Sequence, residues 1–299
     1  MGEIPWTSHR LMLRLTQIEG LLVNDAPLRV GVGGETPLSS TANLAIVKMR
    51  VAGRTLPYIP GSSLKGVLRS ACTALAKLKE LLVCSGLSGQ TCMDYPYLEL
   101  GNAKLLEYVQ RLLSDNRNLE ALKIFHEKAC LLCKVFGAPS FKGHLDIDDA
   151  YPIDEKVQVG IRAGIAIDRR TGAAYPRAYY QVEYVEPGTR FRFRVRATNL
   201  PNYALGLIAK ALRMIHEGWV RIGGFKSRGF GRVHFEDLVF RSWDAEGKGL
   251  VMRAIDAVDE EVDLTGVAKL EDGWIVARGS YAWQALGRLE EVWERAKLG

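Results

Sequence analysis

Residues 60–69, which read Pro-Gly-Ser-Ser-Leu-Lys-Gly-Val-Leu-Arg, combine the residue types that can hold an anion. A Pro-Gly turn precedes two serines, and Ser62 or Ser63 is expected to cap the helix that follows. Lys65 and Arg69 are four residues apart, so they should lie on one face of that helix. Unpaired N–H groups at a helix start, beside a hydroxyl and two cations, suit a phosphate group. The alternative is an ordinary capped helix with two solvated cations.

A second candidate phosphate site lies in residues 221–232, Arg-Ile-Gly-Gly-Phe-Lys-Ser-Arg-Gly-Phe-Gly-Arg. Its glycines, beginning with Gly223 and Gly224, allow the main chain to approach a ligand and to turn N–H groups toward it. Positive charge comes from Lys226 and Arg228, on either side of Ser227. No Gly-Lys-Ser/Thr opens a helix here, which excludes a nucleotide-binding P-loop. The glycines precede a strand, which excludes a dinucleotide fingerprint. A tight helix-to-strand connection is the alternative.

The cysteines form a third group. Cys130-x-x-Cys133 has the spacing of half a zinc site, which Cys84 and Cys92 could complete. His126 is an alternative ligand, and free thiols or a disulfide are alternatives to a metal. Zinc held by four protein ligands would be structural, because no coordination position would remain open for catalysis. The fifth cysteine, Cys72, is expected in the core of the helix after Pro60.

A regular order of elements must position these residues. Apolar residues at helical spacing from Leu64 to Leu82 predict one helix, and a second is expected from Pro201 to Gly218. Strands are expected near residues 11–22, 144–151, 190–197 and 233–240. This order predicts an α+β, ferredoxin-like (RRM-like) fold with an antiparallel sheet. Residues 84–140 would form a partly helical inserted subdomain, and residues 155–185 a long hairpin around the turn signal at 168–172.

Charge divides the chain at residue 243. Residues 244–299 hold 7 Lys and Arg against 12 Asp and Glu, a net charge of −5. Since the whole chain has a net charge of +6, residues 1–243 carry +11. A basic body indicates a polyanionic partner, and the acidic segment is expected to be a separate extension that ends in a helix from about Ala282. A solvated basic surface is the alternative. We expect a cytoplasmic protein, because no apolar run reaches ~18 residues and Met1–Arg10 lacks a signal-peptide core. The 13 Asn and Gln residues hint at a thermophilic source.

Together these motifs resemble the RAMP superfamily, whose members act in CRISPR RNA-guided systems. The resemblance is carried by residues 60–69, by Cys130-x-x-Cys133-x-x-Phe136-Gly137, by Gly164-Ile-Ala-Ile-Asp-Arg-x-Thr-Gly172 and by the 221–232 loop, in the family's order. It is strongest to the repeating backbone subunit of type III effector complexes. It implies copies stacked along a guide RNA, together with other RAMP subunits and target RNA.

The resemblance also implies roles for particular segments. The 155–185 hairpin would act as a thumb that kinks the guide and displaces a base. The chain would hold the sugar-phosphate backbone without reading base identity. The residues expected to contact RNA are Lys48, Ser62, Ser63, Lys65, Arg69, Arg162, Arg169, Gly223, Gly224, Lys226, Ser227 and Arg228.

Cleaving members of the family carry an aspartate in the loop before the Pro-Gly-Ser-Ser motif. In residues 39–48 of this chain, Ala42 stands at that position, and no Asp or Glu lies between Glu35 and Glu80. Without a carboxylate to bind a metal ion or direct the 2′-hydroxyl, we expect no RNA cleavage. Glu35 could take this role only under a different alignment of the loop.

Two other functions stay open. One is a metal-dependent endoribonuclease acting on target or guide-precursor RNA, although the histidines, His9, His144, His216 and His234, form no catalytic pattern. The other is a metal-stabilised interaction protein without an RNA role, which would leave the basic body unexplained.

Overall fold

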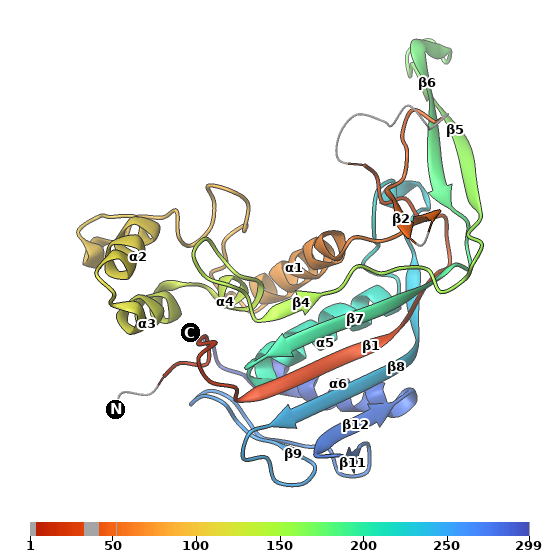
Figure 1. Ribbon diagram of the computed structural model, residues 1–299. Helices are drawn as coiled ribbons and strands as arrows, with labels where there is room; N and C mark the ends of the chain where they lie inside the picture. The colour runs from red at the N-terminus through yellow and green to blue at the C-terminus, as the bar shows by residue number, and fades with distance from the viewer. Residues whose placement is uncertain (1–3, 33–41, 52, 299) are drawn as a thin grey trace.

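The computed structural model describes residues 4–32, 42–51 and 53–298, so Glu35 lies outside the described residues. Its centre is a six-stranded antiparallel sheet with the order β11-β12-β8-β1-β7-β4 (Figure 1). These strands are β1 (Arg14–Asn24), β4 (Leu145–Ile147), β7 (Arg190–Thr198), β8 (Val233–Asp244), β11 (Lys269–Glu271) and β12 (Trp274–Arg278). The helices α1 (Gly61–Leu78) and α5 (Asn202–His216) follow β1 and β7. The sequence β1-α1-β4-β7-α5-β8, with the sheet order β8-β1-β7-β4, confirms the ferredoxin-like fold.

Strand β7 shows why the sheet has one buried face. Phe191, Phe193 and Val195 are at most 2% exposed, while the arginines between them point outward. These arginines do not form a free cationic surface, because Arg194 pairs with Glu19 and Arg196 pairs with Asp148. Carboxylates therefore balance much of the positive charge on the outer face of this strand.

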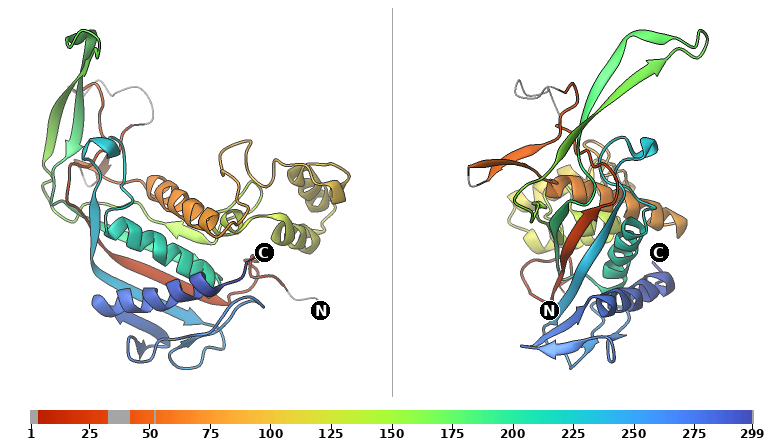
Figure 2. Two further views of the ribbon diagram at one scale, coloured as in Figure 1. Left: turned by 180° about the vertical axis from the view of Figure 1, so that it is seen from behind. Right: turned by 90° about the vertical axis from the view of Figure 1, so that its right-hand side faces the viewer.

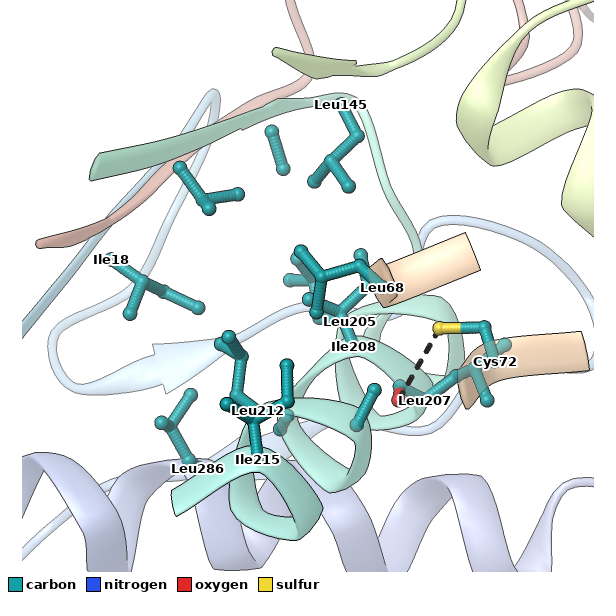
Figure 3. Packing of buried hydrophobic residues seen from close by; sticks show 14 of the residues in the cluster. Ile18, Leu68, Cys72, Leu145, Leu205, Leu207, Ile208, Leu212, Ile215 and Leu286 are labelled. Atoms are coloured by element: carbon teal, nitrogen blue, oxygen red, sulfur yellow. Dashed lines mark hydrogen bonds between the residues drawn. The ribbon is translucent and has the colours of Figure 1, made fainter. Parts of the chain in front are cut away.

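The buried face is covered by helices. The apolar stripe of α1 packs on α5 through Leu64, Leu68 and Leu75, and Cys72 donates to the Leu207 carbonyl oxygen at 3.9 Å (Figure 3). The expectation that the stripe continues to Leu82 is wrong. Helix α1 ends at Leu78, and the Leu78 and Leu82 side chains are 81% and 95% exposed.

Two structures project from opposite ends of α1 (Figure 1). The predicted insertion contains η1 (Leu98–Leu100), α2 (Leu105–Ser114), α3 (Asn118–Lys128) and α4 (Leu131–Phe136), and it has a small apolar core of its own. The predicted thumb is the hairpin of β5 (Val159–Ile167) and β6 (Ala174–Val185), which extends away from the body in both views of Figure 2. A short hairpin of β2 (Lys48–Val51) and β3 (Arg54–Pro57) precedes α1.

The acidic segment from residue 244 on shares the core of the body. It forms β9 (Val251–Met252), β10 (Val262–Asp263), β11, β12 and α6 (Ser280–Arg295). Strand β12 pairs with β8, and α6 packs on α5 so closely that a Cβ on Gly206 would lie 2.1 Å from the Leu289 carbonyl oxygen. Residues on both sides of position 243 belong to one apolar cluster. The division of the chain at this position therefore rests on charge alone and stays a prediction. None of the described helices has the length and apolar character needed to cross a membrane.

Candidate nucleic-acid interface and metal centre

Aromatic rings and arginines meet where the β5–β6 hairpin leaves the body. A cavity of about 360 Å³ lies there, and its lining includes Arg162, Tyr180, Phe225, Arg228 and Phe230. The Arg162 guanidinium lies 5.0 Å from the Phe230 ring centroid, and that of Arg228 lies 5.2 Å from the Phe225 centroid. Arg228 also donates to the Tyr180 hydroxyl at 2.5 Å. Such a cavity offers planar surfaces for a base and positive charge for a phosphate.

Glycines in β5 leave room for tyrosine rings of β6, and one of these glycines, Gly164, lines the cavity. Gly164 pairs with Tyr180 across the hairpin, and a Cβ on Gly164 would lie 2.3 Å from the Tyr180 ring. Gly160 pairs with Tyr184 in the same way, with a Cβ 2.6 Å from that ring. Both tyrosine rings therefore lie across the glycine backbone, which no larger residue would allow.

Sequence reasoning placed Arg162 and Arg228 in this interface but missed its aromatic part. The signal that could have revealed it is the two-residue spacing of Tyr180, Val182 and Tyr184, which puts them on one face of β6. Phe225 and Phe230 lack such a pattern, because they lie in the loop on either side of the short helix η2 (Lys226–Arg228).

The main-chain cradle predicted for the glycine loop is wrong for three of its amides. The N–H of Gly224 donates to the Arg29 carbonyl oxygen at 2.8 Å, and that of Gly231 donates to the Pro27 carbonyl oxygen at 2.9 Å. The Arg228 N–H donates to the Phe225 carbonyl oxygen within the loop. Two of these amides therefore fasten the loop to the segment that contains Pro27 and Arg29, and the third closes a turn within the loop.

Glycine at position 223 is required by that same packing. Gly223 has φ +79°, and a Cβ there would lie 2.2 Å from the Arg29 carbonyl oxygen. The groups left at the surface are the side chains of Lys226, Ser227 and Arg228, which are exposed. These three side chains are therefore the charged and polar groups with which the loop could contact a phosphate.

The start of α1 also differs from the prediction, because here too a main-chain N–H donates to a group of the protein. The helix begins at Gly61, before both serines that were expected to cap it, and neither Ser62 nor Ser63 caps it through its side chain. Instead the Gly61 N–H donates to Asp149 Oδ1 at 2.7 Å. A carboxylate of the protein thus takes the place that was predicted for phosphate.

Lys65 and Arg69, predicted as a pair, face different surroundings. Lys65 is half-buried, and burial lowers its pKa while Asp146 opposes the shift. Arg69 turns toward the insertion, with Nη2 at 3.8 Å from Cys84 Sγ and 3.7 Å from Cys133 Sγ. The two cations therefore have different neighbours, although both lie on α1.

Three further predicted positions lie around the thumb. Lys48 forms an ion pair with Glu183 of β6 at 2.5 Å, and Arg169 is exposed in the turn at the hairpin tip. Ala42, at the position of the expected aspartate, is 3% exposed and precedes a segment that bonds to β6 at Gln181. No acidic side chain stands at position 42 to replace the expected carboxylate.

The four cysteines of the insertion come together as predicted. Their Sγ atoms, in Cys84, Cys92, Cys130 and Cys133, all lie within 4.8 Å of one another. Cys84 Sγ is 3.8 Å from Cys130 Sγ and 3.2 Å from Cys133 Sγ. Four thiolates about 2.3 Å from a tetrahedral metal ion would be about 3.8 Å apart, so the cluster could hold a metal ion. Hydrogen bonds among the four thiols lower the pKa of Cys84 and Cys130 and raise the pKa of Cys92 and Cys133.

His126 is not part of the cluster. Its Nδ1 lies 3.1 Å from Thr7 Oγ1, and burial lowers its pKa to about 4. The four sulfur atoms are therefore the group that could hold a metal ion.

Comparison with known families gives one match. The model described as RAMP superfamily matches residues 25–234, which is more than half of the chain. The matched region contains α1, the insertion with its cysteines, the β5–β6 hairpin and the glycine loop. No curated protein matches the chain.

Proposed function

This chain belongs to the RAMP superfamily, and we propose on that basis that it binds guide RNA as a backbone subunit of a type III CRISPR effector complex. Family membership indicates a CRISPR-associated role in RNA binding. The observation that carries the finer proposal is the arginine- and aromatic-lined cavity at the base of the β5–β6 hairpin. A cavity of about 360 Å³ suits a single displaced nucleotide, which is the element that a kinked guide presents at a thumb.

The chemistry of the cavity favours binding without base discrimination. Its described lining contains arginines, aromatic rings and aliphatic side chains, and none of Asn, Gln, Asp or Glu. Stacking on Tyr180 or Phe225 uses the face of a base, which every base has, whereas discrimination needs donors and acceptors directed at base edges. The two arginines are engaged within the protein, since Arg228 donates to the Tyr180 hydroxyl and Arg162 lies over the Phe230 ring. Affinity should therefore be similar for RNAs of different sequence.

The test is the affinity for single-stranded RNA as a function of salt. The double variant Lys226→Ala/Arg228→Ala should bind more weakly, and the slope of log affinity against log salt should shrink by about 0.7 for each lost phosphate contact. Lys248→Ala removes an exposed cation from the turn after β8 and serves as the matched control. Equal slopes for the double variant and the wild type would refute the proposed contacts.

We further propose that this subunit does not cleave target RNA. The support is Ala42, a buried side chain without a carboxylate at the position where cleaving relatives carry aspartate. The reconstituted complex should leave matched target RNA intact in the presence of Mg²⁺ or Mn²⁺. Regular cuts that disappear after Glu35→Ala in this subunit alone would overturn the proposal and favour the endoribonuclease alternative.

Zinc is the metal that we assign to the four cysteines. Four thiolates in a closed tetrahedral set are typical of structural zinc, which leaves no open position for a substrate. When bound, the ion would staple the segment around Cys84 and Cys92 to the start of α4. Elemental analysis of protein purified without chelators should find about one zinc per chain, and a ratio near zero would exclude it.

The outer side of the hairpin supports a role for neighbouring copies. Val159, Ile161, Ile165 and Ile167 are between 37% and 62% exposed along β5. A two-stranded hairpin is only marginally stable alone, so an apolar row of this kind favours a partner. We assign it to a second copy of this chain bound to the same RNA. The variant Val159→Ser/Ile161→Ser, at positions outside the cavity lining, should reduce the number of copies that sediment on a long RNA while leaving the affinity of one copy for a short RNA unchanged.

A further inference from the structure

Arg69 is enclosed by the insertion. Its side chain leaves α1 and ends beside Cys84 and Cys133, with Nη2 at 3.8 Å and 3.7 Å from the two sulfur atoms. Nη1 donates to the Gly137 carbonyl oxygen at 3.4 Å, and the guanidinium lies 5.8 Å from the Phe136 ring centroid.

Gly86 completes the enclosure from the other side. Its φ is +73°, and a Cβ there would lie 2.3 Å from the guanidinium carbon of Arg69. The segment between Cys84 and Cys92 thus passes directly over the arginine, which a larger residue at position 86 would prevent.

The charge of Arg69 lacks a carboxylate partner. Within the described part of the chain, no Asp or Glu forms an ion pair with it, and its Nε is buried without a hydrogen-bond partner. Arg69 is partly buried, and a charge that is withdrawn from water without a counter-charge is unfavourable. The anions within reach are the cysteine thiolates. Four thiolates around a divalent ion carry a net charge of −2, which one guanidinium would halve.

We propose that Arg69 is a positioning residue of the metal centre, donating to the thiolates of Cys84 and Cys133 and tying the insertion to α1. The proposal rests on the metal site assigned above. It also moves Arg69 out of the RNA-contacting set, because a side chain engaged with two thiolates inside the insertion is not available to a phosphate. Lys65, one turn nearer the helix start, remains the RNA-contact candidate of the pair.

The first test measures metal affinity by competition with a chelator, using Zn²⁺ and, for its absorption spectrum, Co²⁺. Loss of a group that hydrogen-bonds a metal ligand typically weakens binding by about 10- to 100-fold, which is the result expected for Arg69→Gln. Arg69→Lys keeps the charge but loses the planar fork, so a smaller loss is expected. Lys77→Gln removes an exposed cation from the same helix and should bind metal as the wild type does.

Several results would overturn the proposal. Metal affinities of both Arg69 variants within twofold of the wild type would do so, and so would an unchanged thiolate-to-Co²⁺ absorption band in Arg69→Gln. Helical content, measured in excess Zn²⁺, shows whether Arg69→Gln folds. If Arg69→Gln does not fold, the metal affinity of Arg69→Lys is the deciding measurement. A metal affinity equal to that of the wild type then refutes the proposal.

The second test separates this proposal from the proposed RNA binding. In the zinc-loaded protein, Arg69→Gln should leave the salt dependence of RNA affinity unchanged, whereas Lys65→Gln should reduce the slope by about 0.7. An equal reduction in both variants would make Arg69 a phosphate contact and refute the proposal. An unchanged slope in both supports the assignment of Arg69 and counts against the contact proposed for Lys65.

Discussion

The Arg14–Asp244 ion pair joins the body to the C-terminal segment, and its disruption should be severe. Arg14 donates from Nε and Nη2 to the two carboxylate oxygens of Asp244, each at 2.6 Å. The side chains are 0% and 1% exposed. Arg14 also donates to Asn202 Oδ1 at 2.7 Å and to the Arg253 carbonyl oxygen at 2.6 Å. A guanidinium in β1 thus holds the end of β8, the start of α5 and the segment after β9.

The cost of Asp244→Ala follows from this burial. Removing one partner of a buried pair leaves an uncompensated charge and typically costs about 3–5 kcal/mol. That is a large part of the ~5–15 kcal/mol by which folded domains are stable. With an m-value of about 3 kcal/mol/M in urea, the midpoint should fall by about 1–1.7 M. The double variant Arg14→Met/Asp244→Leu removes both charges and should cost less than Asp244→Ala alone.

The assay is urea unfolding followed by two probes. Far-UV circular dichroism reports on all helices, while tryptophan fluorescence gives added weight to the C-terminal segment, which holds three of the six tryptophans, Trp274, Trp283 and Trp293. The two transitions should coincide, because both parts share one core. The reasoning is refuted if Asp244→Ala costs less than about 1 kcal/mol, or if the double variant is the less stable of the two. Separate transitions would show instead that the segment after residue 243 folds independently.

Three further predictions concern the cavity, helix α1 and acid stability. Tyr180→Ala should weaken RNA binding by about 5- to 150-fold, from a stacking contribution of about 1–3 kcal/mol, while Tyr281→Ala on α6 should not; equal affinities would exclude base stacking there. Gly61→Ala should destabilise the fold by about 1–3 kcal/mol, because its Cβ would lie 2.3 Å from the Ile147 carbonyl oxygen. Gly66→Ala, with no atom within 4 Å, should instead stabilise it by up to about 1 kcal/mol in thermal unfolding, and the reverse order would contradict the packing at Gly61. Burial lowers the pKa of His144 from 6.5 to about 4, so between these values the unfolded chain binds a proton that the folded chain excludes. Stability should therefore fall as pH drops from 6.5 to 4, and urea midpoints of His144→Gln should depend less on pH in this range; an unchanged dependence would argue against the shift.

Much of the framework could be predicted because it follows from local periodicity. The stripe of Leu64, Leu68 and Leu75 predicted α1, and the alternation of Phe191, Phe193 and Val195 predicted β7. The end of α1 could not be predicted in this way. Leu82 continues the helical spacing, but the chain leaves the helix at Leu78, so the apolar pattern has no partner surface there.

The candidate sites divide in a similar way. Spacing identified Cys130 and Cys133 as ligands, and the number of cysteines in the insertion supplied Cys84 and Cys92, which the fold brings within 4.8 Å. Glycine content identified the 221–232 loop correctly but assigned its amides to a ligand. Since a main-chain N–H must find a partner when the loop packs, Arg29 and Pro27 accept from two of these amides instead.

The order of the elements and most of their apolar faces could be inferred from the sequence, because both depend on neighbours along the chain. Which polar groups remain available to a ligand depends on the tertiary structure. Asp149 reaches the start of α1 from a segment 88 residues away, and the insertion closes over Arg69. The helical period of a sequence predicts which side chains share a face. What covers that face depends on contacts between segments that are distant in the sequence.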